Sequence, residues 1–218
     1  MANFDLVSQN MGLLLRDVKN LSPIIRKDLA SVNEKDRSVG FLCEQLSESC
    51  QVTSQHQRPT VQSALIGFAT ILARVELARK SLYQRISPLA GNFLLTPASQ
   101  VQQVSTAIKK RDTILKKAQR LPPAQNDPKA AQNNAIRTQA QQLNAQAIQE
   151  VRAWSATYHE DIRKSFREYA HAQMEFAAKA LEEWSIFIED LTLLDFNRDT
   201  DEIITMLEEG GGVVDPNQ

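Results

Sequence analysis

Basic side chains cluster in the middle of the sequence, where together they could bind an anionic surface. The stretch KKRDTILKKAQRLPPAQNDPK, residues 109–129, carries seven basic residues and two acidic ones in a chain whose formal net charge is only -1. With the next base along the chain, the candidate residues are Lys109, Lys110, Arg111, Lys116, Lys117, Arg120, Lys129 and Arg137. Each Lys or Arg near an anionic membrane contributes about 1 kcal/mol to binding. The cluster therefore predicts contact with an extended polyanion or an anionic membrane surface.

Other residues that could do chemistry lack the partners they would need. Glu168 and His171 have the Glu-x-x-His spacing of di-iron helical bundles, but such a site needs a second copy of the motif, which the sequence does not contain. His56, His159 and His171 have no Cys or His partner at metal-ligand spacing. No glycine-rich phosphate loop or nucleophile elbow occurs. We therefore predict no enzyme, with no catalytic residue, metal site or cofactor.

The cysteines and the hydropathy pattern indicate a soluble, intracellular protein. Cys43 and Cys50 are seven residues apart, which on a helix places them roughly 10 Å from each other, too far for a mutual disulfide. We expect both to be reduced and half-buried. No uninterrupted apolar run approaches the length of a membrane span, and the N-terminal residues lack the pattern of a signal peptide.

The composition predicts an all-α protein made of a few long helices. Seven Gly and eight Pro are few for a chain of many short elements, and aromatic residues make up only 6%. Proline breakers near residues 59 and 122 leave three helical segments, at about 4–57, 60–121 and 128–195. Apolar residues of the third segment recur at steps of three, four, seven or eight, as in a coiled coil. A helix of this length would be roughly 95 Å long.

Further prolines predict bends and helix starts within these segments. Pro88 and Pro97 should bend the second segment and need not end it, because the helical pattern resumes at Val101. Asp127 is the expected N-cap of the third helix and Pro128 its first residue. Pro23 is expected in the first turn of a new helix that would interrupt the first segment.

The uneven distribution of apolar and aromatic residues predicts a homodimer. They are concentrated where the start of the second segment would meet the end of the third in a helical hairpin, and they exceed what one chain would bury. The candidate dimer-interface residues are Phe68, Leu72, Val75, Phe166, Tyr169, Phe176 and Trp184. We expect a two-fold dimer with a six-helix centre and two thinner arms.

Charge is segregated along the chain in the same way. Residues 101–150 contain eight basic and three acidic residues, a net charge of +5, whereas residues 172–218 contain two basic and twelve acidic residues, a net charge of -10. The predicted hairpin places the basic excess at the arm tips and the acidic excess at the centre and tail. Basic patches at both ends of one dimer suit an extended polyanion or an anionic membrane surface.

Three stretches make the chain similar to the BAR-domain superfamily, whose crescent-shaped dimers of kinked three-helix antiparallel coiled coils bind and shape membranes. They are RISPLAGNF at 85–93, KKRDTILKKAQR before a short proline-containing tip, and SFREYAHAQMEFAAKALEEWSIFIEDL at 165–191. Within the superfamily the chain most resembles the ciliary BAR family, whose members bind Chibby. The similarity covers about residues 30–195. It implies a BAR domain at 23–196. The residue patterns add an amphipathic helical segment before it, at 1–22, and an acidic tail after it, at 197–218.

The same resemblance implies the partners and the location of the protein. The partners would be anionic phospholipid, a second copy of the chain and a small coiled-coil adaptor such as a Chibby-like protein. The protein would be cytoplasmic and peripheral to a membrane, at the base of cilia or on endomembranes. Nucleic acid is disfavoured, because no aromatic residue lies among the lysines and the sequence pI is near 6.3.

Two alternatives remain open from the residues alone. The chain could be a cytosolic coiled-coil scaffold or adaptor whose basic stretch is a solvated face and which binds no lipid. The N-terminal segment, with Phe4, Val7, Met11, Leu14, Leu15 and Val18 on one helical face, could insert into a membrane or pack on the protein. Packing is favoured, because Arg16 and Lys19 are its only bases.

Overall fold

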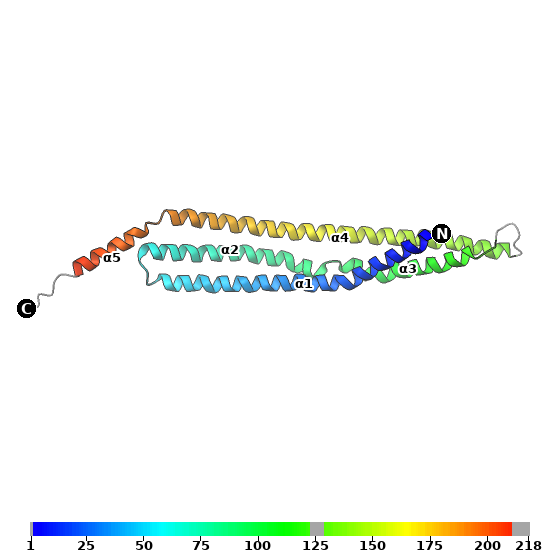
Figure 1. Cartoon of the computed structure of the whole chain (residues 1–218), viewed down its shortest axis with the longest axis horizontal. Coiled ribbons are helices and arrows are strands. Elements are labelled where there is room, and N and C mark those ends of the chain that lie inside the picture. Colours follow the sequence, from blue (N-terminus) through cyan, green and yellow to red (C-terminus); the bar gives the residue numbers. More distant parts are fainter. Residues whose placement is uncertain (1, 123–128, 211–218) are drawn as a thin grey trace, which may run out of the picture. The chain divides into compact units, whose positions relative to one another are not determined.

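The protein is all-α, as predicted. The computed structural model describes residues 2–122 and 129–210 and contains no strand within those ranges. Figure 1 shows the helices in chain order. They are α1 (Ala2–Ser54), α2 (Pro59–Asn92), α3 (Leu95–Gln119), α4 (Ala130–Thr192) and α5 (Phe196–Gly210). The helices α2 and α3 together occupy the second predicted segment.

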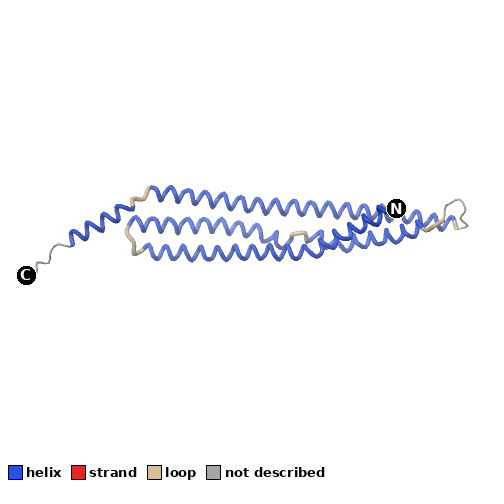
Figure 2. The backbone as a smooth tube through the Cα atoms, viewed as in Figure 1, coloured by secondary structure: helices blue, strands red, loops and turns tan. Residues whose placement is uncertain are grey.

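Two of the prolines lie inside long helices and do not end them. Pro23 lies inside α1, which continues through it, so the predicted interruption of the first segment does not occur. Pro88 likewise lies inside α2. The break between α2 and α3 falls at Leu94, whose φ of 53° is left-handed, and Figure 2 shows a loop there. The predicted N-cap Asp127 and Pro128 lie outside the described residues, and α4 begins at Ala130.

The chain divides into two compact units, which are described separately. Unit 1 comprises residues 1–31 and 87–169, and unit 2 comprises residues 32–86 and 170–218. The helices α1, α2 and α4 each contribute residues to both units.

Unit 2 is an antiparallel helical bundle of α1, α2 and α4. The Ser47 hydroxyl donates to the Ala69 carbonyl at 2.9 Å, and the Lys80 ammonium contacts Glu44 at 2.6 Å, so contacts move down α1 as they move up α2. The Arg74 guanidinium contacts Glu183 on α4 at 3.2 Å. The core residues contributed by α2 recur at helical spacing; they are Ala69, Ile71, Leu72, Val75, Ala78, Leu82 and Ile86.

Unit 1 packs the start of α1, the helix α3 and the first part of α4 around a second core. Its central residues are Leu15, Val18, Val101, Val104, Ile108 and Trp154. Leu15 and Val18 are thus buried and Met11 packs against them, as expected of an N-terminal segment that packs on the protein. The antiparallel order of α3 and α4 is that of the predicted hairpin.

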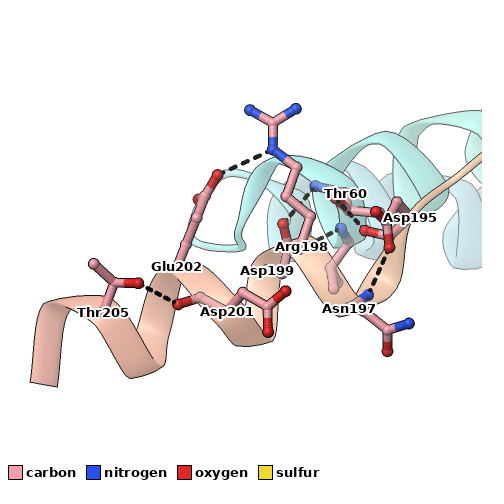
Figure 3. A network of polar contacts seen from close by, with 9 residues as sticks. Thr60, Asp195, Asn197, Arg198, Asp199, Asp201, Glu202 and Thr205 are labelled. Atoms are coloured by element: carbon pink, nitrogen blue, oxygen red, sulfur yellow. Dashed lines mark hydrogen bonds and ion pairs between the residues drawn. The ribbon is translucent and has the colours of Figure 1, made fainter. Parts of the chain in front are cut away.

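The predicted acidic tail contains a helix that is tied to unit 2. Figure 3 shows Asp199 of α5 reaching the first turn of α2, where its carboxylate accepts the backbone N–H groups of Thr60 at 3.3 Å and Val61 at 3.1 Å. The Thr60 hydroxyl donates to the Asp195 carbonyl. A carboxylate at a helix N-terminus satisfies N–H groups that have no partner within the helix. The start of α5 therefore caps α2.

One stretch of the described chain, Pro59–Gln119, is long and apolar enough by composition to cross a membrane. In unit 2 its apolar side forms the core against α1 and α4, and it places Glu76, with 4% of its side chain exposed, inside the bundle. A helix that packs in a protein core satisfies the same composition test. We therefore interpret its apolar face as a packing face.

Candidate functional site

The basic helix α3 is held in place by two hydrogen bonds from α4. The Leu94 N–H donates to the Asp161 carboxylate at 2.6 Å, at the break that precedes α3. The Trp154 indole N–H donates to the Pro97 carbonyl at 2.9 Å in the buried core. Pro97 lies in the first turn of α3, where its missing N–H costs no helical hydrogen bond. These contacts hold the start of α3 against α4 and so set the rotation of α3 about its own axis.

Four bases of α3, together with Arg120 at its C-cap, share one side of the helix. The residues Val101, Val104 and Ile108 direct one side of α3 into the core. At about 100° per residue, the exposed bases fall within roughly a third of the circumference; they are Lys109, Lys110, Lys116, Lys117 and Arg120. We call these five residues the basic face. They could contact an anionic surface together, because one side of one helix carries them all.

The other three candidate bases are placed differently. Arg111 points away from the basic face, with 11% of its side chain exposed, and its Nε donates to Asn144 at 3.0 Å. Arg137 is half-buried, and its guanidinium donates to the Pro122 carbonyl at 2.6 Å and to Asn134 at 3.1 Å. Lys129 is exposed just before α4. Arg111 therefore links α3 to α4, and Arg137 links α4 to the turn after α3. Neither side chain lies on the basic face.

Three bases of unit 2 that could have extended such a face are engaged in ion pairs. Arg79 is mostly buried and pairs with Glu76 at 3.3 Å, its guanidinium lying 4.9 Å from the centre of the Phe176 ring. Lys80 pairs with Glu44, and Arg85 pairs with Glu175 at 2.5 Å. Their charges are thus partly balanced within unit 2.

The candidate dimer-interface residues divide by burial. Leu72 and Val75 lie in the core of unit 2, where this chain's own helices cover them. In the same unit Phe68 and Trp184 are half-buried, with ring centres 5.9 Å apart, and Phe176 is half-buried beneath Arg79. In unit 1, Tyr169 is half-buried, and Phe166 is 63% exposed beside Phe93.

Unit 2 exposes two apolar stripes that the sequence interpretation did not single out as interface. On α1, Val32, Val39 and Leu46 are 44, 45 and 47% exposed. On α4, Met174, Leu181 and Ile188 are 68, 70 and 61% exposed. Each stripe has a spacing of seven residues, which is the spacing of a coiled-coil seam. We call them the α1 stripe and the α4 stripe.

The residues considered for metal or redox chemistry are dispersed in the described part of the chain. No group of three His, Cys, Asp or Glu side chains within it could hold a metal ion. Cys43 and Cys50 are both free and half-buried.

Two functionally suggestive carboxylates were missed from the sequence. Burial raises the pKa of Glu76, although the nearby Arg79 acts to lower it. Desolvation acts to raise the pKa of Asp199, but hydrogen bonds from Thr60 and Val61 outweigh it and hold that pKa below its usual range. For Glu76, the available sequence signal was Gly40, a glycine in the interior of α1 that lies opposite it. For Asp199 there was no sequence signal, because its partners Thr60 and Val61 lie far away in the chain.

Comparison with known proteins identifies the fold. No protein-family model matches the chain, and no curated protein matches it. The chain is similar to a solved structure of the N-terminal I-BAR domain of D. discoideum IBARa, with a TM-score of 0.56 and 14% sequence identity, covering 92% of each chain. This likeness shows a BAR-type fold and confirms the predicted all-α fold of three long helices; it does not test the predicted homodimer. The likeness does not show that the chain belongs to the ciliary BAR family.

Proposed function

We propose that this protein is a peripheral membrane protein that binds anionic lipid through the basic face of α3 and acts as a homodimer that senses or generates membrane curvature. The observation that carries the proposal is the presence of five exposed bases on one side of α3 and its C-cap. The BAR-type fold supports it, because the resemblance to that superfamily implies membrane binding and shaping. The exposed stripes of unit 2 support the dimer.

The basic face suits a fluid anionic surface more than a specific ligand. Its residues are exposed, and no aromatic side chain lies among them. Exposed lysines and arginines contribute additively and weakly to binding at a charged bilayer, and salt screens their effect. A dimer would carry two such faces, so modest affinities at each would combine through multivalency.

The proposed dimer uses the α1 stripe and the α4 stripe. Exposed apolar side chains at heptad spacing are normally covered by another helix. Leu72 and Val75 are already covered within the chain, so a second copy would pack against the stripes outside them. Among the original candidates, Trp184 and Phe176 lie on the same helix as the α4 stripe and could border the interface.

Co-sedimentation with vesicles of phosphatidylserine and phosphatidylcholine tests the lipid-binding proposal. We expect the parent protein to sediment with the vesicles at low salt and to be released at high salt. Reversing two charges of the basic face, in Lys109→Glu/Lys116→Glu, should abolish sedimentation while helicity and oligomeric state are kept, because exposed charge changes usually cost the fold under about 0.5 kcal/mol.

A matched variant separates position from total charge. Lys19 and Lys27 are exposed on α1 in unit 1, and Lys19→Glu/Lys27→Glu changes the net charge equally. This variant should still sediment. Equal loss in both variants would mean that binding follows net charge, and a parent that stays in the supernatant would favour a cytosolic scaffold or adaptor without direct lipid binding.

Light scattering tests the dimer separately. The parent should have the mass of two chains at micromolar concentration. Leu181→Asp should shift it to one chain, because an unpaired charge is not tolerated in a packed apolar seam. An unchanged mass in this variant would remove the α4 stripe from the interface.

A finer part of the proposal concerns location and partner. The sequence resemblance to the ciliary BAR family supports a cytoplasmic protein at the base of cilia that binds a small coiled-coil, Chibby-like adaptor. Mixing the purified protein with such an adaptor and measuring the mass of the complex tests this. Failure to form a complex would leave the membrane proposal unaffected.

A further inference from the structure

The helix α5 of unit 2 exposes an apolar side. Phe196, Ile203 and Leu207 are separated by seven and four residues, so they share one side of the helix. Their exposed fractions are 46, 41 and 70%. We call these three residues the α5 stripe. We propose that the α5 stripe is a docking surface for an amphipathic helix of a partner protein, one whose apolar side is bordered by basic residues.

A different side of α5 holds the helix to α2. The Asp199 carboxylate accepts the N–H groups of Thr60 and Val61 (Figure 3). The Arg58 guanidinium donates to the Met206 sulfur at 3.2 Å. Asp199 and Met206 are seven residues apart and lie about 70° around the helix from the α5 stripe. The contacts with α2 therefore anchor α5 and leave the α5 stripe exposed.

Negative charge borders the α5 stripe on the side away from these contacts. The helix carries five acidic residues and one basic residue, a net charge of -4, and the base, Arg198, pairs with Glu202 at 3.1 Å. Asp201 and Glu208 are exposed and seven residues apart, about 130° from the α5 stripe. We call them the acidic row. Ile204, 47% exposed, lies between this row and the α5 stripe.

This combination specifies the chemistry of the partner. Apolar residues at helical spacing commonly serve as anchors when one helix packs against another protein. Basic residues at the edge of the partner's apolar side would then meet the acidic row. Opposite charges across an interface speed association and exclude partners of the wrong sign. The partner is therefore a basic amphipathic helix.

The same charges argue against two other occupants of the α5 stripe. Helices that lie in an anionic membrane surface carry Lys and Arg on their polar face, whereas α5 has a net charge of -4. The α5 of a second copy would bring its own acidic row beside the first, and like charges side by side are unfavourable. The proposal depends only on α5 and its anchoring, and not on the basic face or the dimer.

Fluorescence anisotropy of a labelled model peptide, titrated with the full chain, tests the docking surface. The peptide has about 14 residues, with leucines on one helical side and lysines on the other. We expect saturable binding that weakens as salt is added. A peptide with glutamate in place of lysine should bind about tenfold more weakly or less. Equal binding of the two peptides, or no saturable binding of the lysine peptide, would overturn the proposal.

Variants locate the binding on α5. Leu207→Gln and Ile203→Gln should each weaken binding of the lysine peptide by about tenfold, because each removes a buried apolar contact. Leu77→Gln is the matched control, since Leu77 lies on α2 of the same unit and is also 70% exposed; it should bind as the parent does. Parent-like binding by both α5 variants, or equal weakening in the control, would contradict docking on the α5 stripe.

A second pair of variants tests the acidic row. Asp201→Asn/Glu208→Gln should weaken binding severalfold and reduce its salt dependence. Glu34→Gln/Glu48→Gln removes the same charge from exposed positions on α1 in unit 2 and should keep the affinity of the parent. Equal weakening in both double variants would show attraction by net charge alone and would overturn the proposed docking geometry.

The docking surface is separable from the proposed membrane function. Leu207→Gln should sediment with vesicles and keep the mass of the parent. Lost sedimentation would assign the α5 stripe to the membrane, and a mass reduced from two chains to one would assign it to the dimer; either result would overturn the proposal. Peptide binding is measured without vesicles, so a parent that does not sediment would contradict the membrane proposal alone.

Discussion

The carboxylate of Glu76 occupies the space beside Gly40 in which any larger side chain would begin. A Cβ atom at position 40 would lie 2.3 Å from Glu76 Oε1, closer than real contacts allow. Glu76 is 4% exposed, and Arg79 Nε lies 3.3 Å from its Oε2. The absence of a side chain on α1 thus makes room in unit 2 for a buried ion pair from α2.

Replacing Gly40 by Ala should destabilise the protein. The new methyl group would displace the Glu76 carboxylate from its place beside Arg79, and overpacking of this kind costs about 1–3 kcal/mol. Chemical denaturation followed by circular dichroism measures the change in the free energy of unfolding. The cost should disappear in a Glu76→Ala background, where the clashing group is absent.

Gly12→Ala is the matched control for this variant. Gly12 also lies inside α1, but nothing lies within 4 Å of a Cβ atom placed there. Alanine should therefore stabilise the helix at this position by about 0.5–1 kcal/mol. Destabilisation by both alanines would show that the effect at position 40 does not come from Glu76.

Glu76→Gln should change how stability depends on pH. Burial raises the pKa of Glu76 above its ordinary value of 4.5. A carboxyl whose folded-state pKa is raised contributes its stability below the ordinary value, and that contribution is lost as the pH rises through the folded-state pKa. The parent should therefore lose stability relative to Glu76→Gln as the pH rises above 4.5. A difference between the two proteins that does not change with pH would contradict a shifted Glu76.

Asp199→Ala should release the start of α5 from α2. It removes the acceptor for the Thr60 and Val61 N–H groups, so hydrogen exchange at these two amides should become faster. Because the folded-state pKa of Asp199 is lowered, the parent should show the same release when the pH falls through that lowered value. Asp201→Ala, on the exposed side of α5, should leave both amides protected. Unchanged exchange in Asp199→Ala would mean that the cap does not hold α5.

Trp154→Phe should loosen the start of α3. Phenylalanine cannot donate to the Pro97 carbonyl, and a buried acceptor left without its partner costs about 1–3 kcal/mol. Thermal and denaturant unfolding measure the loss. Trp184→Phe is the control, since the contacts of this half-buried indole are to the rings of Phe68 and Phe187. A loss in the control as large as that in Trp154→Phe would argue against the role of the Pro97 hydrogen bond.

The helices were predictable because their signals are local. Proline positions and apolar spacing depend on neighbours within a turn or two, so the three long segments and the end of α4 near residue 192 followed from the sequence. Pro23 was misread because a proline can remain in a long helix when packing on both sides of it outweighs the lost hydrogen bond. Leu15 and Val18 provide such packing on its N-terminal side.

The same local reasoning places the bases but does not decide which are covered. Helical periodicity alone puts Lys109 and Lys116 on one side of α3 and Arg111 on the other. Whether that other side meets solvent depends on Ser8 and Asn144, which lie more than thirty residues away in either direction. An apolar groove that Arg111 lines therefore depends on the packing of α1, α3 and α4 against one another.

The apolar stripes show the same division. The sequence determined that Leu72 and Val75 share a face of α2, and that Leu181 and Ile188 share a face of α4. Only the tertiary structure decided that the first face is buried within the chain and the second is exposed. The physical reason is that periodicity determines which residues of a helix point the same way, whereas burial depends on which side of that helix its neighbours occupy.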